Sequence, residues 1–293
     1  MNDTLCSKFD FMRKHLPDKL GEDSILDFYQ IENIKKYCPD ENCDTDFDKN
    51  TAGFLWLLGE CYSTVIDKSY KENNTNVFFL YMISWFSYKL NQITGNKFTK
   101  INDLYTNYVK NSGKYEAFIT DAYRIGDLKG FMDERNDLLN INIEDLSKFY
   151  DAFNLLCIMY GRVAQNKKDD KLLNDAKDFV KKYQELNRYS NNTDVSSYRQ
   201  ILSSLSTNYD DLKIKCKNDQ TLPEIPASIY ALTSEDTSSS SIGNKLFTVL
   251  SIFGAIAFFL GISYKYSLFG FRKRAQKQYL REKIKNIKKK MNH

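Results

Sequence analysis

The chain has 293 residues, of which 42% are hydrophobic, with 20 Tyr and 20 Phe, a composition that excludes an intrinsically disordered protein. Only 12 Gly and 4 Pro are present, which favours helices over a many-stranded β fold. Residues 265–293 carry eleven basic side chains against one acidic one, a net charge of +10, whereas the preceding residues hold 31 basic and 37 acidic side chains, a net charge of −6. A nucleic-acid-binding domain is not expected, because its basic surface should lie on the folded part.

The first thirty residues contain no apolar stretch of the roughly 7–15 residues that a secretory signal peptide needs. Two targeting modes are therefore open. Either an apolar segment further along the chain is itself the signal, or the protein is tail-anchored with its large domain in the cytosol.

Helical periodicity dominates residues 1–217, for which we predict an α-helical, cysteine-containing domain. Residues 54–66 and 77–93 are aromatic-rich runs long enough for buried helices. Apolar side chains alternate at spacings of three and four in residues 146–163 and again in residues 195–216. Each of these two patterns covers only about three heptads, so packing within one helical bundle is favoured over a coiled coil.

Residues 218–244 contain Pro223, Pro226 and a run of four serines, and we predict a flexible stalk there. Residues 246–264 contain no charged side chain and are bracketed by Lys245 and Lys265. At about 1.5 Å per residue they reach roughly 28 Å, close to the thickness of a hydrocarbon core. We therefore predict a transmembrane helix over residues 245–265, in preference to a buried core helix.

Gly254, Ala257 and Gly261 form a small-residue face on the predicted span. Such a face allows transmembrane helices to approach closely, although the ordinary glycine and alanine content of a membrane helix also explains it.

The predicted tail, residues 266–293, is strongly basic. Its cluster Arg272, Lys273, Arg274 and Lys277 lies next to the predicted membrane surface, and residues 280–291 have the pattern of a basic amphipathic helix. Such a tail suits anionic lipid or a cytoplasmic protein partner; the alternative is a solvated tail that only fixes topology. Of the twenty residues before the span one is basic, against seven of the twenty after it. The tail should thus be cytoplasmic and the N-terminal domain should face away from the cytoplasm.

An even number of cysteines in an outward-facing domain predicts disulfides. We take Cys6, Cys38, Cys43, Cys61 and Cys216 as candidates, with at least one bond that involves Cys38 or Cys43. Cys61 and Cys157 lie in apolar helical runs and are also suited to being buried thiols. A zinc site is disfavoured, because no second close Cys/His pair accompanies Cys38 and Cys43.

Catalytic chemistry has little support in the sequence. Only two histidines are present, His15 and His293, so a Ser-His or Cys-His pair lacks a credible base. The stretch from Asp44 to Asp48 imitates the start of a calcium loop but lacks the turn glycine and the bidentate glutamate. We predict no catalytic, cofactor or metal site.

Five segments carry a resemblance to a known family, and together with their surroundings they extend it over essentially the whole chain. They are KYCPDENCDTDFDKNTAGFLWLL (residues 36–58), FTKINDLYTNYVKNSGKY (98–115), IEDLSKFYDAFNLLCIMY (143–160), FVKKYQELN (179–187) and the C-terminal block (249–293). The chain resembles the Plasmodium interspersed repeat (PIR) proteins of the yir/bir/cir type from rodent malaria parasites.

The resemblance implies an α-helical ectodomain on one membrane span, exported without a typical N-terminal signal to the surface or membranes of the infected red cell. No enzymatic activity is attributed to the family, and roles in antigenic variation, immune evasion and adhesion are proposed for it. The family's cysteines match at Cys38, Cys43, Cys157 and Cys216. Because the further cysteine that many members carry soon after the helix at 146–163 is missing here, we expect Cys157 to be a free thiol.

We therefore expect a non-catalytic variant surface antigen, whose ectodomain meets a host-cell receptor or antibody. The alternative is a structural or trafficking protein of internal or vacuolar parasite membranes that acts through its basic tail.

Overall fold

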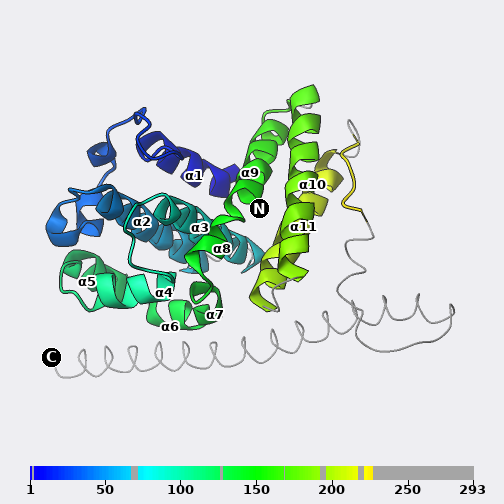
Figure 1. Ribbon diagram of the computed structural model, residues 1–293. Coiled ribbons are helices and arrows are strands. Elements are labelled where there is room, and N and C mark those ends of the chain that lie inside the picture. Colours follow the sequence, from blue (N-terminus) through cyan, green and yellow to red (C-terminus); the bar gives the residue numbers. More distant parts are fainter. Residues whose placement is uncertain are drawn as a thin grey trace, which may run out of the picture. The chain divides into compact units, whose positions relative to one another are not determined.

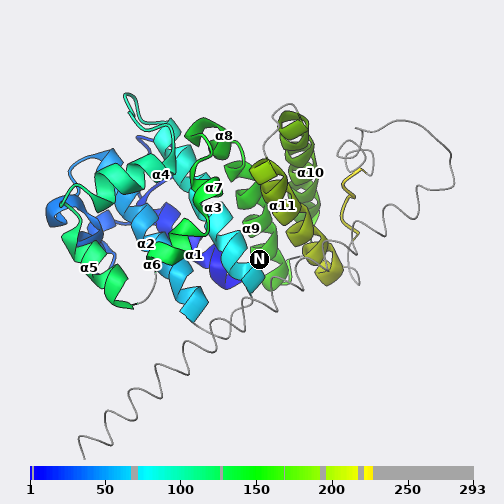
Figure 2. The same cartoon turned by 90° about the horizontal axis from the view of Figure 1, so that it is seen from below.

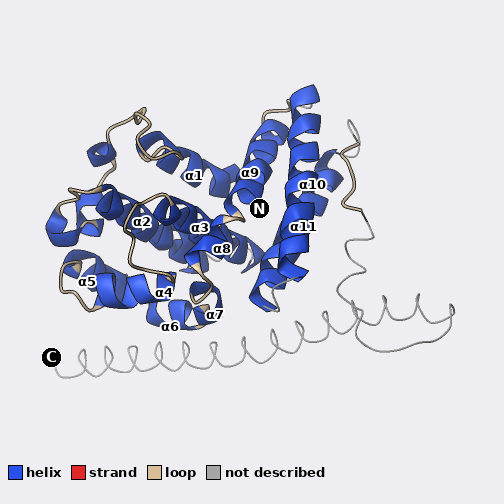
Figure 3. Ribbon diagram, in the orientation of Figure 1, coloured by secondary structure: helices blue, strands red, loops and turns tan. Residues whose placement is uncertain are grey.

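The computed structural model describes residues 1, 3–66, 72–125, 128–167, 169–191, 196–216 and 221–226. Every regular element in these ranges is a helix, as Figure 3 shows, and the predicted mainly α class is confirmed. No helix in the same ranges is both long and apolar enough to cross a bilayer. The predicted span and tail lie outside the described residues, as does the predicted stalk apart from residues 221–226.

The chain divides into two units, Met1–Ser234 and Glu235–His293, and the second lies wholly outside the described residues. The first half of the first unit has two long helices and several short ones. They are α1 (Asp3–His15), the 3₁₀ helices η1 (Phe28–Gln30), η2 (Ile34–Tyr37) and η3 (Pro39–Glu41), α2 (Asp46–Ile66), α3 (Glu72–Asn91), α4 (Ile101–Asp103) and the π-helical η4 (Leu104–Lys110).

The second half of the unit ends in three longer helices. Its elements are α5 (Glu116–Ile125), α6 (Leu128–Asp133), α7 (Asn136–Leu139), α8 (Ile143–Ser147), α9 (Tyr150–Ala164), α10 (Asp170–Asn191) and α11 (Ser196–Cys216). In Figures 1 and 2, α9, α10 and α11 lie side by side at one end of the unit, and α5 lies at the other.

Aromatic side chains join the two halves. Tyr81 of α3 is fully buried, and its ring stacks on Phe9 of α1 at a centroid distance of 3.7 Å and on Phe153 of α9 at 5.6 Å. A second stack, Phe179 on Tyr209 at 4.7 Å, joins α10 to α11. Burial of such large rings is the main favourable contribution to folding, so the aromatic content read from the composition forms the core.

α2 approaches its neighbours most closely at Gly53. A β-carbon at this position would lie 2.9 Å from Leu16, 3.0 Å from Trp85 and 3.2 Å from Met12. These distances are shorter than ordinary contacts between carbon atoms. The helix therefore needs glycine here to pack at once against α3 and the end of α1.

We expect Gly53→Ala to lower the free energy of unfolding by about 1–3 kcal/mol, because the added methyl group overpacks a tight interface. Urea denaturation followed by tryptophan fluorescence measures the change. Gly161→Ala is the matched control: it lies inside α9 with no atom within 4 Å of its β-carbon position, so the better helix propensity of alanine should leave stability equal or higher. Equal stability of the Gly53 variant and the parent chain contradicts the tight contact.

Candidate binding surface

The six cysteines are the first predicted site residues that the structure places. Cys6 of α1 and Cys157 of α9 form a disulfide with an S–S distance of 2.01 Å across 151 residues of sequence. Cys38 and Cys43 form a second disulfide that closes a short loop around η3. Cys61 and Cys216 are buried and keep their thiols.

Two expectations about the cysteines are therefore corrected. Cys157 is bonded and not a free thiol, because α1 packs along α9 and brings the α-carbons of Cys6 and Cys157 to 5.2 Å. Cys61 and Cys216, which we took as disulfide candidates, are in no disulfide. The Cys61 thiol instead faces the carbonyl oxygen of Thr75 on α3, at 3.7 Å, and burial raises its pKa.

The predicted small-residue face, Gly254, Ala257 and Gly261, lies outside the described residues. The same is true of the basic cluster Arg272, Lys273, Arg274 and Lys277.

The acidic stretch that imitates a calcium loop starts a helix. Thr45 precedes α2, and its hydroxyl donates to the carboxylate of Asp48 at 2.6 Å and accepts from the Asp48 backbone N–H at 3.1 Å. The Thr45 N–H donates back to the same carboxylate at 3.2 Å. This is a capping box that uses aspartate in place of glutamate. The second carboxylate oxygen of Asp48 accepts from the hydroxyl of Tyr108 at 2.7 Å.

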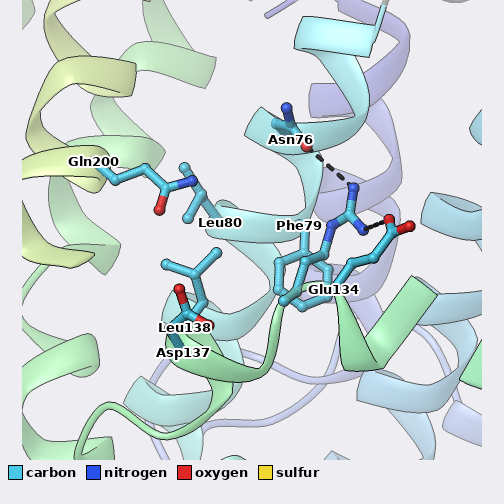
Figure 4. Close-up of a pocket in the computed structure, with 8 residues that line it drawn as sticks. Asn76, Phe79, Leu80, Glu134, Asp137, Leu138 and Gln200 are labelled. Atoms are coloured by element: carbon cyan, nitrogen blue, oxygen red, sulfur yellow. Dashed lines mark hydrogen bonds and ion pairs between the residues drawn. The ribbon is translucent and has the colours of Figure 1, made fainter. Parts of the chain in front are cut away.

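A small hollow of about 170 Å³ lies between α3, the α6–α7 connection and α11 (Figure 4). Its main polar group, Arg135, stacks over the ring of Phe131 at 3.9 Å and donates to the side-chain oxygen of Asn76 at 3.2 Å. Arg135 also donates a hydrogen bond to the backbone carbonyl oxygen of Phe131 at 3.0 Å. The hollow is smaller than the roughly 300–1,000 Å³ of small-molecule sites, and its guanidinium is engaged in packing.

One carboxylate links α8, α10 and α11. Asp145 of α8 accepts hydrogen bonds from Tyr189 of α10, from Tyr198 of α11 at 2.7 Å, and from Lys148 at 2.9 Å. Burial opposes ionisation, but the three hydrogen bonds outweigh it and hold the pKa of Asp145 below its ordinary value. From the sequence, Asp145 is expected only to complete a capping-box-like pattern with Asn142, and Asn142 makes no side-chain cap hydrogen bond. The cluster itself has no sequence signal, because the two tyrosines lie 44 and 53 residues away.

Exposed apolar side chains gather on the last turns of α1 and on the segment that follows it. Among the described residues, eight large hydrophobic side chains are exposed, and five of them fall within 19 residues of sequence. These five are Phe11, Leu20, Ile25, Leu26 and Tyr29, and we call them the 11–29 patch. Clustered exposed hydrophobic side chains mark interaction surfaces, whereas scattered ones do not.

Contacts with neighbouring residues connect parts of the patch to the end of α1. The ring of Phe11 lies against the rings of His15 and Trp56, at centroid distances of 4.8 and 5.4 Å. The N–H of Leu26 donates to the Lys14 carbonyl oxygen at 3.0 Å, which brings Leu26 back to the end of α1. Leu20 and Tyr29 line one hollow of about 380 Å³ together with His15. This surface is the candidate binding surface of the described residues.

Alkylation tests the cysteine pairing. We expect two alkyl groups on the unfolded, unreduced chain and six after reduction, because only Cys61 and Cys216 keep thiols. Intact-mass spectrometry counts the groups, and peptide mapping identifies the bond between Cys6 and Cys157. Cys61→Ser is the control and should lower both counts by one. Four labels on the unreduced chain would contradict one of the two disulfides.

The Asp145 cluster gives a pH dependence. Because its pKa is lower in the folded than in the unfolded chain, the unfolded chain binds more protons at acid pH. The contribution of Asp145 is therefore complete above about pH 5 and is lost as the pH falls through about 4 and below.

We expect Asp145→Asn to cost about 1–3 kcal/mol at pH 7 and less at acid pH. Urea denaturation at pH 7 and at acid pH measures the difference. Asp178→Asn, an exposed position on α10, is the control and should change stability by less than about 0.5 kcal/mol. A cost for Asp145→Asn that does not vary with pH would refute the role of its charge.

With this geometry in place, comparison with known proteins identifies the family. A solved structure described as that of a Plasmodium PIR protein ectodomain is similar, with a TM-score of 0.56 and 33% sequence identity. The similarity covers 76% of this chain and 98% of that chain. No curated protein matches. The sequence model of the family described as Plasmodium variant antigen protein Cir/Yir/Bir matches residues 6–265, and this chain therefore belongs to that family.

Proposed function

We propose that the protein is a membrane-anchored variant surface antigen that displays its disulfide-containing helical domain outside the parasite cytoplasm, for immune evasion or contact with host cells. Display and binding, without catalysis, are its mode of action. Family membership gives the class of protein. Membrane anchoring and outward display are inferred from the disulfides and the charge distribution of the chain.

The disulfide between Cys6 and Cys157 carries the argument for outward display. Disulfides persist in oxidising compartments and are rare in the cytosol. A helical domain that joins its first helix to α9 in this way suits a non-cytosolic location, which agrees with the excess of basic residues after the predicted span. The tail-anchored orientation, with the domain in the cytosol, is correspondingly disfavoured.

The bonding of three charged side chains supports a non-catalytic role. Asp145 links α8, α10 and α11, and Asp48 caps α2. Arg13 donates to Tyr81 at 3.1 Å and also to Asn154. Each of these side chains makes hydrogen bonds that hold helices together, whereas catalytic groups converge on a cleft.

Protease protection on intact infected red cells tests the proposal. One antibody recognises the N-terminal domain and a second recognises the tail. We expect external protease to remove the domain signal and to spare the tail signal, because the bilayer shields residues on the cytoplasmic side. A cytosolic parasite protein serves as the control for membrane integrity.

Survival of both signals until the cells are permeabilised would place the protein on an internal membrane. That result would reject surface display and favour the trafficking alternative through the basic tail. Loss of the tail signal and survival of the domain signal would reverse the proposed orientation.

A further inference from the structure

We propose that the 11–29 patch docks a protein whose contact surface is apolar and bordered by lysine and arginine side chains. This proposal deepens the proposed function. It rests on that function only for the side of the membrane on which the partner is found. Binding itself is a property of the purified chain.

The apolar part of the argument comes from exposure. Ile25 is 77% exposed, and Leu20, Leu26 and Tyr29 are each about 40% exposed. Apolar side chains on the surface gain free energy when a partner withdraws them from water. Energetically important residues at interfaces are most often large side chains that cluster near a centre. The apolar surface of the partner would cover Ile25 and Leu26, while the hollow between Leu20 and Tyr29 would receive a partner side chain.

The segment that carries the patch is held in place by other helices. The Leu20 N–H donates to the Gln92 side-chain oxygen at 2.9 Å, and the Gln92 side-chain nitrogen donates to Asp18 O at 2.9 Å. Lys89 donates to Pro17 O, and Tyr150 donates to the Asp18 carboxylate at 2.5 Å. These bonds tie the segment to α3 and α9. Preorganisation of this kind lowers the entropy cost of binding.

The charge of the segment selects the charged side chains that border the partner's apolar surface. Residues 16–32 contain five acidic side chains, at positions 18, 22, 23, 27 and 32, and one basic side chain, Lys19, a net charge of −4. Glu22 and Asp23 are exposed beside Ile25. Complementary charge steers association and suppresses wrong partners. The acidic side chains around Ile25 therefore favour a basic protein and repel an anionic lipid surface.

Neighbouring cations do not reverse this charge. Lys8 pairs with Glu60 at 2.6 Å, and Arg13 pairs with Asp10. Asp46, Lys49 and the buried Lys89 also line the hollow, whose own charges balance. The acidic part of the surface is the stretch around Ile25 and Leu26, because residues 20–29 hold three acidic side chains and no lysine or arginine.

The test uses the full chain in nanodiscs of uncharged phosphatidylcholine and two fluorescent amphipathic helical peptides, one of leucine and lysine and one of leucine and glutamine. Fluorescence anisotropy gives each dissociation constant. We expect the lysine peptide to bind about tenfold more tightly than the glutamine peptide at low salt, and the difference to shrink as salt is added.

Two variants separate the apolar and the charged contributions. Ile25→Ser/Leu26→Ser and Glu22→Lys/Asp23→Lys should each weaken binding of the lysine peptide about tenfold. The matched controls are Val65→Ser/Ile214→Ser, which removes exposed apolar side chains elsewhere, and Asp178→Lys. Both should stay within about twofold of the parent chain. Circular dichroism and the urea midpoint establish that each variant folds, and Ile25→Ser alone serves if the double variant does not.

Three outcomes overturn the inference: no binding by the parent chain, equal binding by patch and control variants, or equal binding of both peptides. Self-association of the parent chain in mass photometry, abolished by Ile25→Ser/Leu26→Ser, would assign the patch to a second copy and also overturn it. None of these results bears on surface display, and protease protection is independent of the patch. Failure of the inference is therefore distinguishable from failure of the proposed function.

Discussion

The rest of the described structure depends on the contact between α1, α3 and α9. Tyr81 stacks between Phe9 and Phe153, and its hydroxyl accepts from Arg13. The disulfide between Cys6 and Cys157 crosses the same interface one turn away from Phe9. In the chain-entropy account, a bond that closes a loop of this length stabilises the fold by several kcal/mol, on the order of 4–5. The aromatic stack and the disulfide thus act on one interface, which fixes the first helix against the end of the unit that holds α10 and α11.

That interface also determines where the candidate binding surface lies. Once α1 is fixed, the chain leaves it at His15 and passes the end of α3 before it reaches η1. Lys89 and Gln92, near the end of α3, bind the backbone of Pro17 and Asp18 as the chain passes. Gly53 brings α2 against Leu16 at the start of this segment. The contacts that fix α1 and the end of α3 therefore position the backbone from which Leu20 extends.

Much of this architecture could be predicted from periodicity, and the failures have physical causes. Residues 54–66 fall inside α2, and the pattern over 195–216 corresponds to α11. The pattern over 146–163 predicts one helix, yet the structure divides it between α8 and α9. The break between the two helices is short and keeps the spacing of the apolar residues, so periodicity does not reveal it. α10 went unpredicted although Leu172, Phe179 and Leu186 are buried at heptad spacing, since charged residues outnumber them. Neither the Cys6–Cys157 bond nor the Asp145 cluster has a local signal, because both join residues that only the packing of distant helices brings together.

In this domain, the residues that stabilise the fold are different from those that form the candidate binding surface. This division suits a variant antigen. The core depends on buried aromatic rings, two disulfides and a few carboxylates that join helices, and changes there are costly. Exposed positions such as Ile25 and Glu22 make few contacts, so substitutions at them typically change stability by less than about 0.5 kcal/mol. The same substitutions alter the apolar and charged features by which, under the proposed function, a receptor or antibody would recognise the surface. A chain built in this way can change its surface chemistry while its helices stay the same.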